Sequence, residues 1–184
     1  VRVTFGSGTK IQELFAGVKA QAASKMKEGR DAVTFSTGKL TVQIGKKTGA
    51  LTFFDASGRK LLAEKENPPR QVDTVTHKVW NYFDWTRQER LSAKGVLKDD
   101  RLPLKNTAKY ICYGTKSKRF PLLHSNTGYG IAVAADSDVL CCNIPMYGPY
   151  VSAWNTEIVD YYFIAAPDEE QVIERYISLM NGTV

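Results

Sequence analysis

The chain has 184 residues, of which 43% are hydrophobic and 24% are charged, and its formal net charge is +6. This length and composition suit one globular domain with its own core, and they exclude a chain that is disordered throughout. The excess of positive charge raises the question of nucleic-acid binding, but the lysines are spread over separate polar stretches. We therefore interpret them as a solvated basic surface.

Cysteine and histidine indicate neither disulfides nor a metal. Of the cysteines Cys112, Cys141 and Cys142, the adjacent pair would point to opposite faces of a strand. There is no CxxC spacing, and the histidines His77 and His124 stand alone, so we expect no zinc site and no cofactor. No stretch approaches the roughly 20 apolar residues of a membrane span. We expect a soluble protein, cytoplasmic or periplasmic, without a membrane partner.

The N-terminal part predicts strands around one irregular or helical insertion. The chain begins at Val1 inside a strand-like stretch, which suggests a piece of a longer protein. Apolar residues between 10 and 28 recur at helical spacing, and an irregular excursion between two strands is the alternative. Alternation over 40–44 predicts a half-buried strand. Segments 50–54 and 60–63 flank a turn sequence with Asp, Ser and Gly, so a hairpin is expected there.

The middle of the chain predicts one strand and one long loop. Residues 72–85 are rich in valine, threonine and aromatic residues, which favours a strand. The segment 91–108 combines Gly, Pro and Asp with little periodicity, so it predicts an exposed loop. Loops of this length in compact domains are often functional.

The C-terminal part predicts further strands and a helix. The strands are expected at 110–113, 121–124, 129–134, 139–144, 150–154 and 158–164. The helix is expected from about Asp168 to Met180, with Asp168 as its cap, Gln171 completing a capping box and Asn181-Gly182 as its stop. Many short strands with turns between them predict a mainly β fold, an antiparallel β-sandwich.

The sequence does not present a complete active site. Glycoside hydrolysis, for example, needs two carboxylates on either side of the scissile bond. Asp99 and Asp100 are an acidic pair, but neighbours in one loop rarely converge on one carbon atom. GxSxG, GxGxxG and Walker spacings are also missing. We therefore assign no catalytic residue.

Read in order, several segments resemble the N-terminal domain of glycoside hydrolase family 31. Residues 35–44, 49–55 and 58–64 look like its opening strands. The run 120–131 is similar to that family's "P-hydrophobic-hydrophobic-x-S-x-x-GYG" hairpin. Asp160-Tyr161-Tyr162-Phe163-Ile164, followed by 171–182, is similar to its "DYYFI … V…Y…TG" ending. The likeness covers about 33–182, so the whole chain is interpreted as a single domain of a larger enzyme.

The resemblance implies a β-sandwich of the galactose-mutarotase type, often called a supersandwich. It also implies a retaining α-glycosidase, with α-glucosidase and α-xylosidase as the common cases, whose catalytic aspartates lie in a C-terminal (β/α)8 barrel. This domain would then be inactive alone, would pack on its own barrel, and would lend a loop to the pocket for an oligosaccharide or glycoside. Two departures stand out: 10–28 has no counterpart, and Leu91-Ser92-Ala93-Lys94-Gly95 keeps only the glycine of the family's "YGLGE" motif.

The loop 92–108 is the predicted substrate-binding element, because its polar side chains can bond to sugar hydroxyls. The candidate residues are Asp99, Asp100, Arg101, Lys105 and Asn106. A solvated loop without a ligand is the alternative.

Two other functions stay open. A stand-alone carbohydrate-binding module would expose coplanar aromatic rings on one sheet face, with Trp80, Trp85 and Trp154 as candidates. A basic interaction or nucleic-acid-binding domain would bind in a salt-dependent way.

A docking domain should also keep an apolar patch that its barrel covers. The candidates for that patch are Tyr147, Tyr150 and Trp154, which lie near Pro145 and Pro149.

Overall fold

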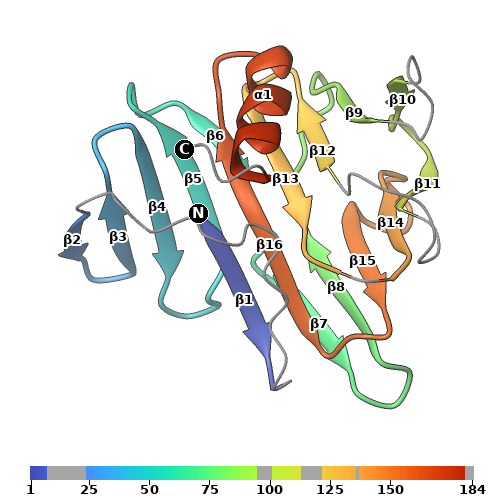
Figure 1. Cartoon of the computed structure of the whole chain (residues 1–184). Helices are drawn as coiled ribbons and strands as arrows, with labels where there is room; N and C mark the ends of the chain where they lie inside the picture. Colours follow the sequence, from blue (N-terminus) through green and yellow to red (C-terminus); the bar gives the residue numbers. More distant parts are fainter. Residues whose placement is uncertain (8–23, 95–100, 113–121, 136, 181–184) are drawn as a thin grey trace.

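A computed structural model describes residues 1–7, 24–94, 101–112, 122–135 and 137–180. These residues form three antiparallel β-sheets and one α-helix (Figure 1). The predicted mainly β fold with a C-terminal helix is confirmed. Within these ranges, no helix is long and apolar enough to cross a bilayer.

The six-stranded sheet has the order β1-β16-β13-β12-β9-β10. Its eight-residue strand β16 pairs with the edge strand β1 on one side and with β13 on the other. The β12–β13 hairpin forms around the turn 126–128, as its sequence predicts. The strands of this sheet are β1 (Arg2–Gly6), β9 (Leu91–Lys94), β10 (Arg101–Pro103), β12 (Leu122–Ser125), β13 (Tyr129–Val133) and β16 (Ile158–Ala165).

The two other sheets have five strands each. In the N-terminal sheet the strands follow chain order: β2 (Lys25–Glu28), β3 (Ala32–Ser36), β4 (Leu40–Gly45), β5 (Leu51–Asp55) and β6 (Lys60–Ala63). The β8 sheet has the order β11 (Ala108–Cys112), β14 (Val139–Cys142), β15 (Tyr150–Trp154), β8 (Lys78–Tyr82) and β7 (Arg70–Asp73).

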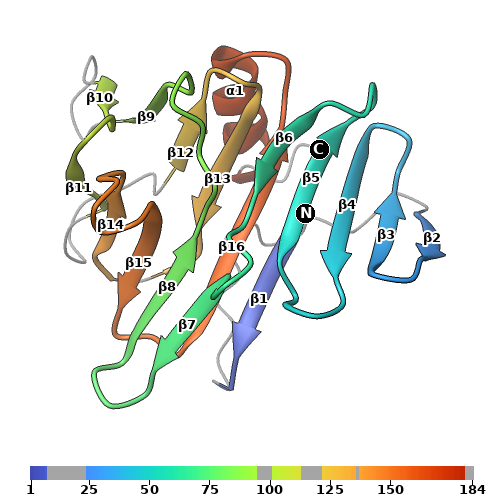
Figure 2. The ribbon, with the colours of Figure 1, turned by 180° about the vertical axis from the view of Figure 1, so that it is seen from behind.

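The N-terminal sheet and the β8 sheet join edge to edge. The backbone of 63–65 pairs with that of 82–84, through the Glu64–Phe83 bridge and the bonds Lys65 N to Tyr82 O (3.0 Å) and Asp84 N to Ala63 O (2.9 Å). Together they make the second layer of a sandwich, opposite the six-stranded sheet. Figure 2, seen from behind, shows β6 and β7 in front of β16.

The core lies between these layers. Phe53 of β5 stacks on Phe163 of β16 with ring centroids 4.0 Å apart, and Phe163 in turn stacks on Tyr129 at 5.5 Å. Phe83 meets Tyr161 edge to face at 5.8 Å. All five side chains are buried. The stack ties the N-terminal sheet to the six-stranded sheet, and the Phe83–Tyr161 pair ties the segment after β8 to the same sheet.

Helix α1 (Glu169–Met180) covers the other face of the six-stranded sheet (Figure 1). Val172 and Tyr176 are buried against Leu122, Ala132 and Ile164. The predicted cap is present: Asp168 accepts from the Gln171 backbone N–H at 2.9 Å, and the Gln171 side-chain amide donates to the same carboxylate at 2.8 Å.

Three expectations about elements need correction. The end of the predicted N-terminal helix is strand β2, because Lys25–Glu28 pairs with β3; residues 8–23 lie outside the described residues. The predicted strand 72–85 is broken by a turn, in which the Asp73 carboxylate accepts from the Val75 and Thr76 N–H groups and His77 has φ 49°. Residues 74–77, Thr-Val-Thr-His, contain no Gly, Pro or Asn, so this turn has only Asp73 as a local signal.

The third correction concerns the predicted loop 91–108. It contains the strands β9 and β10, and β9 also pairs with β12. Three- and four-residue strands show no usable periodicity, so only their tertiary partners identify them.

Candidate functional site

A cleft of about 500 Å³ lies where β8 and β14 end and β15 begins. Neighbouring antiparallel strands alternate in direction. The last residues of β8 and β14 therefore lie beside the first residues of β15, at the same end of these strands. Five chain segments line the cleft: Lys65, Asp84–Arg87 with Glu89, Lys105 with Asn106, Asn143 with Pro145, and Pro149.

Glu89 is a structural anchor of the cleft. Its Oε1 accepts hydrogen bonds from Ser125 Oγ at 2.7 Å and from the Tyr129 hydroxyl, and its Oε2 accepts from the Thr86 N–H at 3.2 Å. Burial, together with the Glu89 charge, raises the pKa of Tyr129 well above its usual value. The Tyr129 hydroxyl therefore stays protonated and keeps donating to Glu89. This carboxylate ties the 84–90 segment to the β12–β13 hairpin.

Trp85 forms an aromatic wall beside polar groups. Its ring stacks on buried Phe83 with centroids 5.4 Å apart, while the residue as a whole stays half-buried. Lys105 and Asn106 are exposed in a turn before β11, and Asn106 holds a left-handed backbone with φ 52°. The backbone N–H of Asn143 donates to Thr107 O at 2.8 Å, which fixes this turn against the end of β14.

The structure brings together two of the five predicted substrate-binding residues. Lys105 and Asn106 both line the cleft. Arg101 begins β10, where its Cα pairs with that of Lys94. Asp99 and Asp100 lie outside the described residues.

Most cleft residues are not predicted as members of this site, among them Trp85, Arg87 and Asn143. The sequence suggests Trp85 only as part of a sheet-face platform, and Arg87 follows it in a polar run. Asn143 carries no local signal, because its position depends on the pairing of β14 with β15. The arrangement offers amide, cationic and acidic groups beside one aromatic ring, so it can hydrogen-bond to hydroxyl groups of a ligand and stack on an apolar face of it.

The described residues contain no group of three or more histidine, cysteine or acidic side chains placed to hold a metal ion.

The aromatic residues proposed from sequence separate into two places. Trp80 and Trp154 lie half-buried on the outer face of the β8 sheet, whereas Trp85 lies in the cleft. In the connection between β14 and β15, Met146 is 84% and Tyr147 66% exposed, while Tyr150 and Trp154 are half-buried.

No protein-family model and no curated protein sequence matches the chain. Solved structures do match it. A glycoside hydrolase family 31 α-xylosidase from a soil metagenome has a TM-score of 0.70 at 18% identity, over 90% of this chain and 28% of that one. The cycloalternan-forming enzyme of Listeria monocytogenes has a TM-score of 0.73 at 18% identity, over 89% and 17%.

A third match is the Flavobacterium johnsoniae family 31 dextranase, with a TM-score of 0.67 at 20% identity, over 84% of this chain and 20% of that one. The chain thus spans between 17% and 28% of the length of these three enzymes. From these matches, the chain has the fold of a β-sandwich domain of glycoside hydrolase family 31 enzymes.

Proposed function

We propose that this chain is a non-catalytic β-sandwich domain of a retaining α-glycosidase of the α-glucosidase or α-xylosidase type. It packs on a (β/α)8 catalytic barrel and lends the residues around Lys105 and Asn106 to the rim of the substrate pocket. The observation that carries this proposal is the cleft, in which these residues meet Trp85 and Asn143.

The comparisons support the domain role through their coverage. Most of this chain matches a small part of each larger enzyme. The matched enzymes are an α-xylosidase, a dextranase and a cycloalternan-forming enzyme, and the dextranase was also solved with isomaltotriose. A saccharide built of glucosyl or xylosyl units is therefore the substrate class we propose.

The acidic residues of the cleft support a role away from the reacting carbon. A retaining glycosidase needs two free carboxylates about 5 Å apart, one of them a nucleophile. Glu89 is buried and engaged by Ser125, Tyr129 and the Thr86 N–H, so it is committed to structure. Asp84 is exposed, with its Oδ2 4.0 Å from Lys60 Nζ. The cleft therefore serves binding.

The experiment compares variants of the full-length parent enzyme. Lys105→Ala and Asn106→Gly remove the two side chains, and glycine tolerates the left-handed backbone at position 106. Each lost hydrogen bond of about 1 kcal/mol should raise KM about fivefold, with kcat changed less. Lys47→Ala, a loss of the same charge in the β4–β5 turn, is the matched control and should leave KM unchanged.

The purified 184-residue chain should not hydrolyse an aryl α-glucoside or aryl α-xyloside. Turnover by this chain, or an unchanged KM in both cleft variants of the parent enzyme, would refute the proposal.

A stand-alone carbohydrate-binding module is a second candidate, favoured by one observation. Trp80 and Trp154 share the outer face of the β8 sheet, as such a module requires. The sequence of the parent gene on the C-terminal side distinguishes the two candidates, because only the glycosidase continues into a barrel.

A further inference from the structure

The outer face of the β8 sheet carries a row of aromatic rings. In β8 and β15, Val79, Asn81, Val151 and Ala153 are buried, and the alternate residues of each strand point to the opposite face. The aromatic row consists of Tyr110, Trp154, Trp80, Tyr150 and Tyr82. Tyr110 is 46% exposed and the others are half-buried.

The rings of the row contact one another and keep a defined arrangement. Tyr82 and Tyr150 are cross-strand partners with ring centroids 5.8 Å apart, and Tyr110 lies at the same distance from Trp154. The Lys78 ammonium sits 4.1 Å from the Trp154 centroid and 4.8 Å from the Trp80 centroid. Its attraction to both indoles holds them in place, and a preorganised surface loses less entropy on binding.

The row leads to the cleft. At the end of the row formed by Tyr82 and Tyr150, the neighbouring residues in the chain line the cleft. Asp84 and Trp85 come shortly after Tyr82, and Pro149 comes directly before Tyr150. The Phe83 N–H donates to Pro149 O at 3.0 Å and joins the two chain segments at this point. Along β15, from Tyr150 to Trp154, the row extends over four residue steps, or about 13 Å, which is the length of a short oligosaccharide.

We propose that the aromatic row binds the part of an oligosaccharide that extends out of the cleft. The inference rests on the proposed function and narrows its substrate to chains of several sugar units, as opposed to simple glycosides. Sugar rings present apolar C–H faces that stack on Trp and Tyr. The tyrosine hydroxyls, the exposed Gln71 beside Tyr82 (Oε1 to Oη 3.2 Å) and Lys78 bond to sugar hydroxyls.

The charge of this face favours an uncharged chain over nucleic acid. Aromatic platforms for single strands lie in grooves whose cations follow the phosphates. Here the cation beside the rings is Lys78, whose ammonium group faces the indoles of Trp80 and Trp154. Burial lowers the pKa of Lys78. Asp73 is its cross-strand partner and adds a negative charge beside it. Among the residues that the structure describes, this face offers stacking without a track of positive charge.

The test measures binding of glucose, isomaltotriose and a longer isomalto-oligosaccharide to the purified 184-residue chain by calorimetry and tryptophan fluorescence. Affinity should rise with chain length. Trp154→Leu and Trp80→Leu keep apolar volume on the sheet but remove the rings, and each should weaken binding of the longest saccharide by up to about tenfold. Circular dichroism and thermal melting confirm that each variant is folded, and Tyr110→Ala gives a further variant at a more exposed position.

Tyr147→Ala is the matched control, since it removes an exposed aromatic ring outside the row and should leave affinity unchanged. Four outcomes would overturn the proposal: no saccharide binding by the wild-type chain, equal affinity for glucose and the longest chain, binding of single-stranded DNA in preference to saccharide, or a dimer that only the row variants dissociate. Binding lost in Lys105→Ala and Asn106→Gly but kept in every row variant would overturn the row and leave the proposed function of the cleft standing.

Discussion

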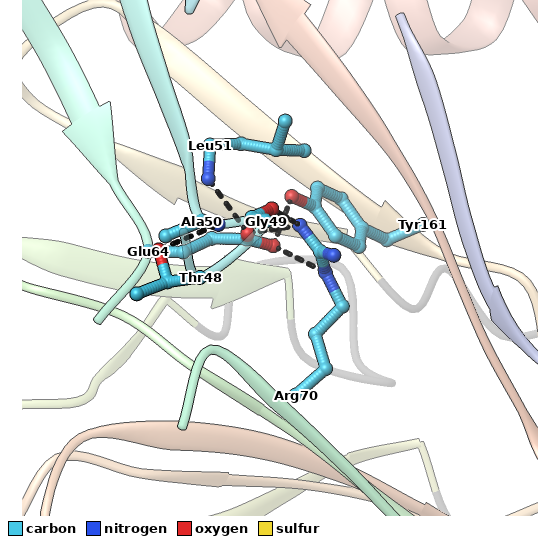
Figure 3. A network of polar contacts seen from close by, with 7 residues as sticks. All are labelled: Thr48, Gly49, Ala50, Leu51, Glu64, Arg70 and Tyr161. Atoms are coloured by element: carbon cyan, nitrogen blue, oxygen red, sulfur yellow. Dashed lines mark hydrogen bonds and ion pairs between the residues drawn. The ribbon is translucent and has the colours of Figure 1, made fainter. Parts of the chain in front are cut away.

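Glu64 is the residue on which the joint between the layers depends (Figure 3). Its side chain is fully buried, and its carboxylate accepts from the Leu51 N–H at 3.0 Å, the Tyr161 hydroxyl at 2.8 Å and both Nε and Nη2 of Arg70. Arg70 also donates to Gly49 O at 3.1 Å. The network links β5, β7 and β16, so one carboxylate satisfies donors from all three sheets.

Glu64→Ala should destabilise the domain by about 3–5 kcal/mol, because it removes the carboxylate that neutralises the Arg70 charge and leaves the Leu51 N–H and the Tyr161 hydroxyl without that acceptor. Urea denaturation measures the free energy of unfolding. Lys46→Ala is the control: the Lys46–Glu28 pair is also close, at 2.5 Å, but its side chains are 37% and 67% exposed, so its loss should cost less than about 1 kcal/mol. Equal losses in the two variants would contradict the assigned role.

At the scale of elements, the contact between α1 and the six-stranded sheet depends on a glycine. A Cβ built on Gly130 of β13 would lie 2.4 Å from Val172 Cγ1 and 3.2 Å from Leu122 Cδ1. Both neighbours are buried side chains in the cluster under α1. The helix packs this closely because position 130 has no side chain, which explains a glycine in the middle of a strand.

Gly130→Ala should destabilise the domain by about 1–3 kcal/mol through overpacking. The loss should be smaller in a Val172→Ala background, which removes the clashing methyl, so a double-mutant cycle should show favourable coupling. Gly45→Ala is the control, because its Cβ would lie 3.3 Å from its nearest neighbour, Thr48 Oγ1, and it should have little effect. Additive losses would show that the helix does not depend on this contact.

At the scale of the whole molecule, the connection between β14 and β15 presents apolar surface to solvent. Met146 and Tyr147 are the most exposed large apolar residues near the cleft, beside Pro145. A domain that packs on a barrel keeps such surface for its partner. This patch overlaps the region proposed from sequence, although Met146 takes the place of the half-buried Tyr150 and Trp154.

The isolated domain should therefore self-associate weakly, and Met146→Ser with Tyr147→Ser should reduce that association and the binding of a hydrophobic dye. Sedimentation velocity across a range of concentrations provides the measurement. Val75→Ser is the control, since Val75 is 87% exposed at the tip of the β7–β8 turn, away from the patch. An effect of the control equal to that of the double variant would remove the patch as a docking surface.

The sequence alone determined the sandwich class, most strands and the capped helix, because these depend on local periodicity and on turn and cap residues. The hairpin at Asp55–Gly58 and the Asp168 cap are signals of this kind. It also placed Lys105 and Asn106 in a candidate site.

Only the tertiary structure decided which residues meet. Lys25–Glu28 is a strand because β3 offers it a partner, and β9 and β10 are too short to show a period of their own. Asn143, Trp85 and Lys105 line one cleft because β8 and β14 end at the same sheet edge, and the aromatic row depends on the register of β8 with β15. These contacts join residues far apart in the chain, and local sequence patterns carry no information about such pairings.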